Sequence, residues 1–324
     1  MTNKALYNRT ISRSQIEIMA PAGNFESLQA AINAGANAVY FGVGHLNMRA
    51  HSSVNFTIAD LEEIVDRCNK AKVKSYLTVN TVLYDHDMAP TRLLLDKALK
   101  VGITAVIASD MAAIMYARQI GLEIHASTQL NISNIEALRF YAQFVDVVVL
   151  ARELILNQVA AISRQIEQEQ IKGPKGELIQ IEMFVHGALC MAVSGKCYLS
   201  LHEFNASANR GACMQTCRRS YTLTDKESGY EIDVENEYLM SPKDLCTIGF
   251  LNKILDAGIT VLKIEGRARS PEYVKRTVEV YSQALDSILD NTYNQLKIDQ
   301  WKEQLQGVFN RGFWDGYYLG QRMG

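Results

Sequence analysis

Eight short apolar runs, separated by amphipathic segments, constrain the fold of this chain more than any other feature. The runs are residues 16–20, 38–42, 74–79, 105–109, 123–127, 147–151, 181–187 and 261–266. Runs of this length without polar alternation are typical of parallel strands that are buried on both faces. The segments between them, such as 24–36 and 57–72, carry apolar residues three and four positions apart. Many end in Ala-Gly, which predicts helices with glycine C-caps.

Eight strands with intervening helices predict an α/β fold, a (β/α)8 TIM-like barrel over residues 15–291. A doubly wound sheet is the alternative, but the first strand-to-helix turn reads APAGN instead of GxGxxG. We expect an insertion at 187–242 after the seventh strand, before a helix that starts near SPKDLC. Residues 1–14 would form an N-terminal tail, and residues 292–324 a C-terminal tail packed on the barrel.

Four of the six cysteines fall within 28 consecutive residues, as Cys190, Cys197, Cys213 and Cys217. Clustered thiolates suit a soft metal such as zinc or iron. Only the last two have the close spacing that is usual in zinc sites, and the wide first spacing is what an irregular loop around a larger iron-sulfur cluster would show. Zinc and metal-free thiols stay open as alternatives. The remaining two, at positions 68 and 246, are expected to be small buried hydrophobes.

The insertion follows the carboxyl end of a barrel strand, where active sites of this fold are built. It should therefore cap the barrel mouth and place the cysteines over it. Polar residues that end the other strands should point to the same place. They are Asn80, Thr81, Asp110, Ser127, Gln129, Arg152, Glu153, His186, Lys263, Glu265 and Arg267.

Composition narrows the compartment and the partners. The 324 residues are 48% hydrophobic and contain no apolar run of membrane-spanning length and no N-terminal signal core. We expect a cytoplasmic protein without a membrane partner, in which thiols stay reduced. The net charge of -2 gives no global attraction to nucleic acid, so RNA binding would need a local patch. Candidates are Arg210, Arg218, Arg219, Arg267, Arg269, Lys275 and Arg276.

Two other chemistries find little support in the motifs. A radical S-adenosylmethionine enzyme would need a C-x3-C-x2-C loop early in the barrel, which the chain lacks. A hydrolase would need a nucleophile beside a base. His186 and Ser194 are near in sequence but match no triad pattern, and no HExxH motif occurs.

Several longer segments resemble one known family, the collagenase-like peptidase family U-32. They include EIMAPAGNFESLQAAINAGANAVYFG, FVHGALCMAVSGKCYLS, NRGACMQTCRR, LMSPKDL and LKIEGRARSPEYV. The resemblance implies oxygen-independent hydroxylation, with prephenate as the apparent source of the hydroxyl group. It also implies a 4Fe-4S cluster on Cys190, Cys197, Cys213 and Cys217, which aerobic purification is expected to strip or replace with zinc.

Within the family, the C-x3-C-R pattern of GACMQTCRR is most similar to the branch that makes 5-hydroxyuridine at the tRNA wobble position. Other branches hydroxylate an rRNA cytidine or a quinone precursor. Many members continue past the RGF segment into a small C-terminal β domain. We therefore expect either a short subtype that works with a paralogous subunit or the barrel part of a longer protein.

A dicarboxylate such as prephenate needs fixed cations, and guanidinium groups pair well with carboxylates. The candidate substrate-binding residues are Arg49, Asn80, Gln129, Arg152, Arg218, Arg219 and Arg267. The candidate catalytic residues are His186, Glu265 and Lys263, with the first two as proton carriers. Rival functions are a peptidase, as the family's label implies, and a zinc-stabilised RNA-binding barrel without catalysis.

Overall fold

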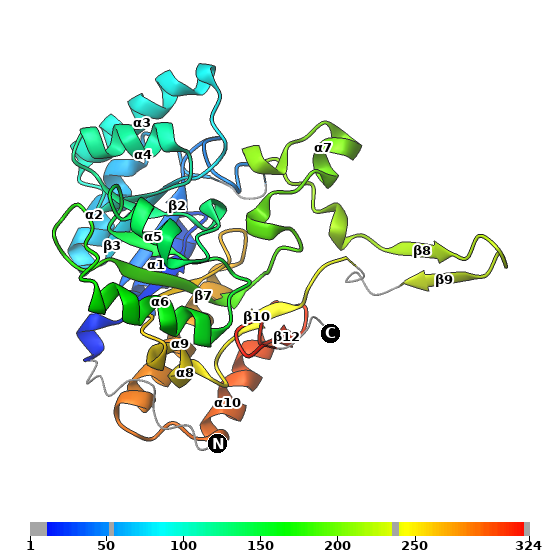
Figure 1. Cartoon of the computed structure of the whole chain (residues 1–324). Coiled ribbons are helices and arrows are strands. Elements are labelled where there is room, and N and C mark those ends of the chain that lie inside the picture. Colours follow the sequence, from blue (N-terminus) through cyan, green and yellow to red (C-terminus); the bar gives the residue numbers. More distant parts are fainter. Residues whose placement is uncertain (1–11, 52–54, 235–239, 321–324) are drawn as a thin grey trace.

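The computed structural model describes residues 12–51, 55–234 and 240–320, and its centre is a parallel β-barrel surrounded by helices (Figure 1). The barrel strands are β1 (Glu17–Pro21), β2 (Ala38–Gly42), β3 (Lys74–Val79), β4 (Ala105–Ala108), β5 (Glu123–Ala126), β6 (Val147–Val149), β7 (Gln180–Gly187) and β11 (Val261–Ile264). Each of the eight predicted runs forms one of these strands.

Strand pairing closes the barrel. Successive strands from β1 to β7 pair in parallel, and β11 pairs with both β1 and β7. In this closing register Val261 lies opposite Glu17 on one side and Glu182 on the other. The predicted (β/α)8 barrel is confirmed, and closure excludes the doubly wound alternative, whose sheet would have open edges.

Helices follow the strands and cover the outside of the barrel (Figure 1). They are α1 (Phe25–Asn33), α2 (Leu61–Ala71), α3 (Met88–Val101), α4 (Met111–Gln119), α5 (Ile135–Tyr141), α6 (Leu156–Gln168), α8 (Leu251–Asp256) and α9 (Pro271–Leu289). The helices predicted in 24–36 and 57–72 are α1 and α2. Glycine ends α3 at Gly102, whereas α2 ends on Lys72 in the left-handed conformation.

The prediction of a helix that starts near SPKDLC is wrong. These residues lead into strand β10 (Asp244–Cys246), and α8 begins only at Leu251. Strand β7 outlasts its barrel neighbours and leaves backbone groups unpaired at its end. There β10 pairs antiparallel to it, with Leu245 opposite Gly187. Burial of these backbone groups requires hydrogen-bond partners, and β10 supplies them.

The C-terminal residues contain a helix that the sequence analysis missed. Helix α10 (Gln295–Gln306) buries Ile298, Trp301 and Leu305, which are spaced at three and four. Strand β12 (Phe313–Trp314) then pairs in parallel with β10. Most of the predicted N-terminal tail, residues 1–11, lies outside the described residues. No helix in the described ranges combines the length and apolar character needed to cross a membrane.

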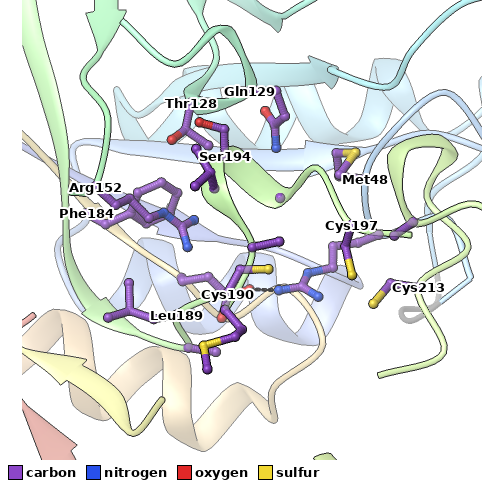
Figure 2. Close-up of a pocket in the computed structure, with 18 of the residues that line it drawn as sticks. Met48, Thr128, Gln129, Arg152, Phe184, Leu189, Cys190, Ser194, Cys197 and Cys213 are labelled. Carbon is purple, nitrogen blue, oxygen red and sulfur yellow. Dashed lines mark hydrogen bonds and ion pairs between the residues drawn. The ribbon is translucent and has the colours of Figure 1, made fainter. Parts of the chain in front are cut away.

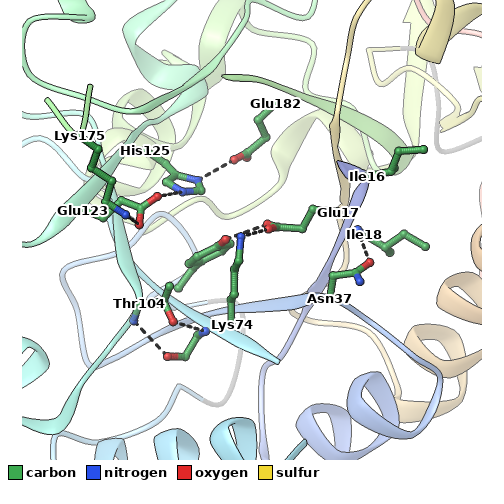
Figure 3. A network of polar contacts seen from close by, with 12 residues as sticks. Ile16, Glu17, Ile18, Asn37, Lys74, Thr104, Glu123, His125, Lys175 and Glu182 are labelled. Atoms are coloured by element: carbon green, nitrogen blue, oxygen red, sulfur yellow. Dashed lines mark hydrogen bonds and ion pairs between the residues drawn. The ribbon is translucent and has the colours of Figure 1, made fainter. Parts of the chain in front are cut away.

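Charged groups occupy the barrel interior near the amino ends of the strands (Figure 3). Glu17 begins β1 and accepts a hydrogen bond at 2.9 Å from the hydroxyl of Tyr76. Its other carboxylate oxygen lies 2.7 Å from Nζ of Lys74. Glu17 and Tyr76 are buried, whereas the Lys74 side chain is exposed, so the buried carboxylate of Glu17 is satisfied by neighbouring side chains instead of by bulk water.

Glu182 on β7 is completely buried and pairs with residues on two other strands. Its Oε2 lies 3.1 Å from Nδ1 of His125, and its Oε1 lies 2.5 Å from Nζ of Lys263. Burial acts to raise the pKa of Glu182, but Lys263 and His125 outweigh it and hold the pKa below its ordinary value. Glu182 is therefore a carboxylate with a cationic partner.

Candidate active site

A cavity of about 220 Å³ opens at the carboxyl ends of the barrel strands, beneath the insertion that follows β7 (Figure 2). Its walls include side chains from β2, β3, β7 and β11 and from the loops that follow β3, β5 and β6, and residues between 188 and 218 cover it. Loops at this end carry the active sites of (β/α)8 barrels. This cavity is therefore the candidate active site.

The insertion consists of short elements and one projecting hairpin. They are η4 (Val193–Gly195), α7 (Leu199–Phe204), η5 (Ala208–Arg210), η6 (Thr216–Arg218), β8 (Tyr221–Thr224) and β9 (Glu231–Val234). The β8–β9 hairpin extends away from the barrel (Figure 1), whereas the preceding residues lie over its mouth.

Specific contacts fix the insertion to the barrel loops. Arg210 Nη1 lies 2.7 Å from Oδ2 of Asp87, and this hydrogen bond lowers the pKa of Asp87 to about 2. Ser194 donates to Oδ1 of Asn131 at 2.9 Å. Gly211 has φ +82°, and a Cβ there would lie 2.4 Å from the backbone oxygen of Asn47. Only glycine allows this close approach, which explains the glycine in NRGAC.

All four clustered cysteines line the cavity. Cys190 is exposed and the other three are partly buried. Burial raises the pKa of Cys217, and the neighbouring thiols Cys190, Cys213 and Cys197 raise it further. The other three thiols therefore lie near enough to Cys217 to affect its ionisation.

The chemistry of this donor set fits a thiolate-bound metal or cluster. As they stand, however, no three His, Cys, Asp or Glu side chains in the described ranges are arranged to hold a metal ion. The predicted lid position of the thiols is thus observed, while their role as ligands stays a prediction.

The other two cysteines are buried, as predicted. Cys68 packs within α2, and burial raises the pKa of its thiol to about 12. Cys246 lies on β10 with its pKa raised to about 11, again by burial. Neither lines the cavity, so these two thiols belong to the core.

Arg267, from the KIEGR segment after β11, lines the cavity, and its side chain is buried. Its Nη1 donates to Oδ1 of Asn47 at 3.0 Å and to Oγ1 of Thr78 at 2.9 Å. Burial lowers the pKa of Arg267 to about 10. A Cβ on Gly42 would lie 2.5 Å from this Nη1, so glycine at the end of β2 makes room for the guanidinium. Its two hydrogen-bond partners are neutral oxygens.

Arg152 and Arg218 also contribute cations to the cavity wall. The guanidinium of Arg152 lies 4.0 Å from the ring centre of Phe184 (Figure 2). Its Nε is buried and has no hydrogen-bond partner among the described residues. Arg218 donates to Gln215 at 3.1 Å, and burial lowers its pKa. These guanidinium groups can offer hydrogen bonds to an anion in the cavity.

Two further cations face the cavity but are paired with carboxylates. Arg49 Nη2 lies 2.7 Å from Oε1 of Glu265, and Lys263 pairs with Glu182 as described above. Burial acts to raise the pKa of Glu265, but Arg49 outweighs it and the pKa is lowered. Burial lowers the pKa of Lys263. A low pKa keeps Glu265 ionised, which suits charge pairing better than donation of a proton.

Asn80 and Gln129 stand side by side on the cavity wall. The Asn80 amide donates to Gln129 Oε1 at 3.3 Å and to the Ser127 hydroxyl at 3.3 Å. Its own oxygen accepts from the backbone N–H of Met48 at 3.2 Å. Glu153 completes the polar wall. These strand-end residues converge as the barrel topology predicted.

The structure does not bring every predicted residue to the cavity. His186 is buried among the rings of Tyr273, Tyr281 and Phe313, and burial lowers its pKa to about 3. It is not among the residues that line the cavity. A neutral core histidine without access to the cavity cannot exchange protons there.

Three other expected positions also lie off the cavity wall. Arg219 is exposed, 3.8 Å from Glu203, and directly follows η6. Asp110 caps α4 by accepting from the Ala112 N–H at 2.9 Å. Thr81 lines a separate hollow beside the insertion. The expectation that all polar strand ends face one point was therefore wrong for Asp110 and Thr81, and Arg219, expected to bind substrate, is not among the cavity-lining residues.

Sequence reasoning missed Glu182, Asn47 and Thr78. Glu182 lies within a run that reads as a buried strand, and a charged residue in such a run was a usable signal, because an unpaired buried charge is costly. Asn47 and Thr78 carried no signal, since their role depends on where Arg267 folds.

The fold and the cavity together define a (β/α)8 barrel protein with a cationic, thiol-lined active-site candidate. A family model described as peptidase family U32 matches residues 23–323, and the chain belongs to this family. A solved structure titled as the U32 peptidase Mk0906 aligns with a TM-score of 0.50 and 12% identity, over 80% of this chain and 96% of that chain. The predicted family is confirmed.

Relatives within the family carry different names. A protein named collagenase from Porphyromonas gingivalis strain W83 is 62% identical over 96% of this chain and 75% of its own length. The tRNA hydroxylation protein P1 of Bacillus subtilis is 33% identical over 94% of this chain and 71% of its length. The 23S rRNA 5-hydroxycytidine synthase of Escherichia coli is 34% identical over 97% of this chain and 47% of its length.

Proposed function

We propose that this protein hydroxylates tRNA without molecular oxygen and forms 5-hydroxyuridine at the wobble position. One observation carries the proposal: four thiols and five cationic side chains line the same cavity at the barrel mouth, against two carboxylates. Thiols suit a redox-active iron centre, and a surplus of cations suits an anionic co-substrate. The combination favours redox chemistry on a bound anion.

Cys190, Cys197, Cys213 and Cys217 would hold a 4Fe-4S cluster, which supplies electron transfer or polarisation of the hydroxyl donor. The donor would be a dicarboxylate such as prephenate. Arg267 and Arg152 are the residues best suited to bind its carboxylates, because neither forms a direct ion pair with an acidic side chain in the described residues. Arg49 and Lys263 already have carboxylate partners and would orient the site.

The choice of RNA rests on the relatives whose names specify RNA hydroxylation, one acting on tRNA and one on 23S rRNA. Hydroxylation of tRNA is preferred because the C-x3-C-R pattern formed by Cys213, Cys217 and Arg218 resembles that branch. Ribosomal RNA is the alternative substrate within the same chemistry.

Peptidase activity is the second candidate, because the relative at 62% identity is named collagenase. The cavity gives it little support. Hydrolysis by a serine or cysteine needs a base within hydrogen-bond reach, and no histidine is among the cavity-lining residues in the described ranges. Ser194 donates to an asparagine oxygen instead of to a base.

Anaerobic purification of the full chain tests the cofactor. We expect a brown protein with iron and sulfide, and loss of both in Cys213→Ala. Cys68→Ala is the matched control, since Cys68 is buried in α2 away from the cavity, and it should retain iron. Stoichiometric zinc with no iron under these conditions would rule out the cluster.

Nucleoside analysis tests the substrate. A strain that lacks the gene should lose 5-hydroxyuridine from digested tRNA, and complementation with the natural chain should restore it, whereas Cys213→Ala should not. Loss of 5-hydroxycytidine from rRNA instead would transfer the function to ribosomal RNA. Unchanged nucleosides, together with cleavage of denatured collagen by the purified protein, would establish the peptidase.

A further inference from the structure

Exposed apolar side chains gather on the insertion around the cavity mouth. Of the twenty large hydrophobic residues that are exposed in the described ranges, seven lie between positions 191 and 214. They are Met191, Val193, Tyr198, Leu199, Leu201, Phe204 and Met214, and we name them the rim patch. Tyr198 is 74% exposed. Apolar surface on this scale marks a binding site, because water contact with it is unfavourable.

The rim patch is continuous with the candidate active site. Met191, Val193 and Leu199 also line the cavity, next to Cys190 and Cys197. A molecule that lies on the rim patch therefore lies beside the cavity that these thiols line. Its occupant is expected to be the macromolecule whose reacting part enters the cavity.

The charges around the rim patch favour a polyanion. Residues 187–219 contain four Lys or Arg and one acidic residue, Glu203, although the whole chain has a net charge of -2. The guanidinium of Arg219 lies 4.6 Å from the ring centre of Phe204 and remains half-exposed. Arg210 lies in the same way over the exposed ring of Tyr84, at 4.1 Å, although its charge is already paired with Asp87. Exposed rings beside guanidinium groups are the surface on which unpaired bases stack and phosphates bind.

The projecting hairpin has the opposite charge. Residues 221–234 contain four acidic residues and one lysine. Tyr230 on this hairpin is exposed to a similar extent as Tyr198, at 66%. Asp233 and Glu231 accept from Thr222 and Thr224 across the hairpin. A polyanion would be repelled by this arm. This difference in charge favours binding of nucleic acid at the rim patch over binding at the hairpin.

We propose that the rim patch binds single-stranded RNA, with Tyr198 and Phe204 stacking the bases that flank the nucleotide entering the cavity and Arg219 contacting the backbone. The inference rests on the proposed function and adds to it the surface that holds the RNA. A base reaches an enclosed pocket only when it is unpaired or turned out of its stack. The flanking bases then need new stacking partners, which the two rings provide.

Fluorescence anisotropy with the full chain and a labelled RNA stem-loop tests this surface. We expect Tyr198→Ala to weaken binding about tenfold, within the range that one base–aromatic stack contributes. Tyr198→Phe keeps the ring and should bind as the natural chain does. Tyr230→Ala is the matched control, a similarly exposed tyrosine on the same insertion, and should leave affinity unchanged. Arg219→Gln should weaken binding and reduce its salt dependence.

Several outcomes would overturn the proposal. Equal affinities for Tyr198→Ala and Tyr230→Ala would remove the rim patch as the RNA surface. Tight binding of a fully paired duplex by the natural chain would remove single strands as the ligand. Self-association in sedimentation experiments that Tyr198→Ala abolishes, with RNA affinity unchanged, would make the patch a protein interface.

The same variants separate this proposal from the proposed function. Hydroxylated nucleoside in tRNA, measured by mass spectrometry, reports on the function alone. Binding that depends on Tyr198 without any hydroxylated product would leave the surface intact and refute the hydroxylation. Hydroxylation that proceeds normally in Tyr198→Ala, with unchanged affinity, would refute only the surface.

Discussion

The barrel interior and the barrel mouth under the insertion differ in how their charged side chains are paired. Inside the barrel, Glu182 lies between His125 and Lys263, and Glu17 is paired with Lys74. At the mouth, Arg267 and Arg152 have no carboxylate partner in the described structure. The interior charges are compensated within the chain, whereas these two guanidinium groups at the mouth are left available for a ligand.

Apolar side chains differ between the two regions in the same way. Leu77 on β3 is completely buried in the main core, whereas Leu223 on the hairpin is 47% exposed. Burial makes the barrel the source of stability, and exposure makes the insertion a surface for interaction. Four substitutions, taken from the largest expected effect to the smallest, test this comparison.

Glu182→Gln should be the most damaging, because it leaves Lys263 and His125 without their shared carboxylate inside the barrel. Removal of one partner from a buried ion pair costs about 3–5 kcal/mol. Urea denaturation followed by circular dichroism would measure the free energy of unfolding. Glu153→Gln, at the exposed cavity edge, is the control and should change it by less than about 0.5 kcal/mol. Similar losses for both would contradict the difference between the regions.

Leu77→Ala should destabilise the fold by about 2–5 kcal/mol, the usual cost of truncating a buried leucine. The same urea experiment measures it. The effect arises from lost burial and from the cavity left among the barrel strands and their covering helices. A loss below about 1 kcal/mol would show that the core around β3 collapses onto the missing side chain.

His186→Phe tests whether this histidine belongs to the core. Burial lowers its pKa to about 3. Below pH 6.5 the imidazole therefore binds a proton in the unfolded state but not in the folded state. The natural chain should therefore lose stability as the pH falls from 6.5 towards 3, by up to about 1.4 kcal/mol per pH unit from this group. His186→Phe should lack this contribution.

Thermal unfolding across that pH range would show the difference between the two chains. If the profile of His186→Phe matched that of the natural chain, His186 would have to be accessible to protons in the folded state, and it would again be a candidate site residue.

Leu223→Ala should have the smallest effect, within about 0.5 kcal/mol, because its side chain is already in water. It matches Leu77→Ala in chemistry and in lying on a strand, so the ratio of the two losses measures how much burial matters. A large loss for Leu223→Ala would mean that the hairpin is packed against something in solution.

Local patterns in the sequence predicted the barrel well. The eight apolar runs became the eight barrel strands because burial on both faces requires continuous apolar residues. Strand β10 was missed because its formation depends on the free end of β7, which is distant in the chain. Helix α10 was missed although Ile298, Trp301 and Leu305 follow a helical spacing.

The candidate site was predicted in part. The thiols and most polar strand ends converge because barrel topology brings all carboxyl strand ends to one face. His186 and Arg219 do not join them, since side-chain direction at the end of a strand or turn depends on local packing. Glu182 was overlooked because its partner, Lys263, is 81 positions away.

By itself, the sequence determined the order of strands and helices, the crowding of four thiols after the seventh strand, and the family. These are properties of neighbouring residues, and local spacing encodes them. Only the tertiary structure decided which cations are already paired. Arg49 pairs with Glu265, which is 216 positions away in the sequence, whereas Arg267 donates its hydrogen bonds to neutral oxygens. Such pairing depends on distances that exist only after the barrel has closed.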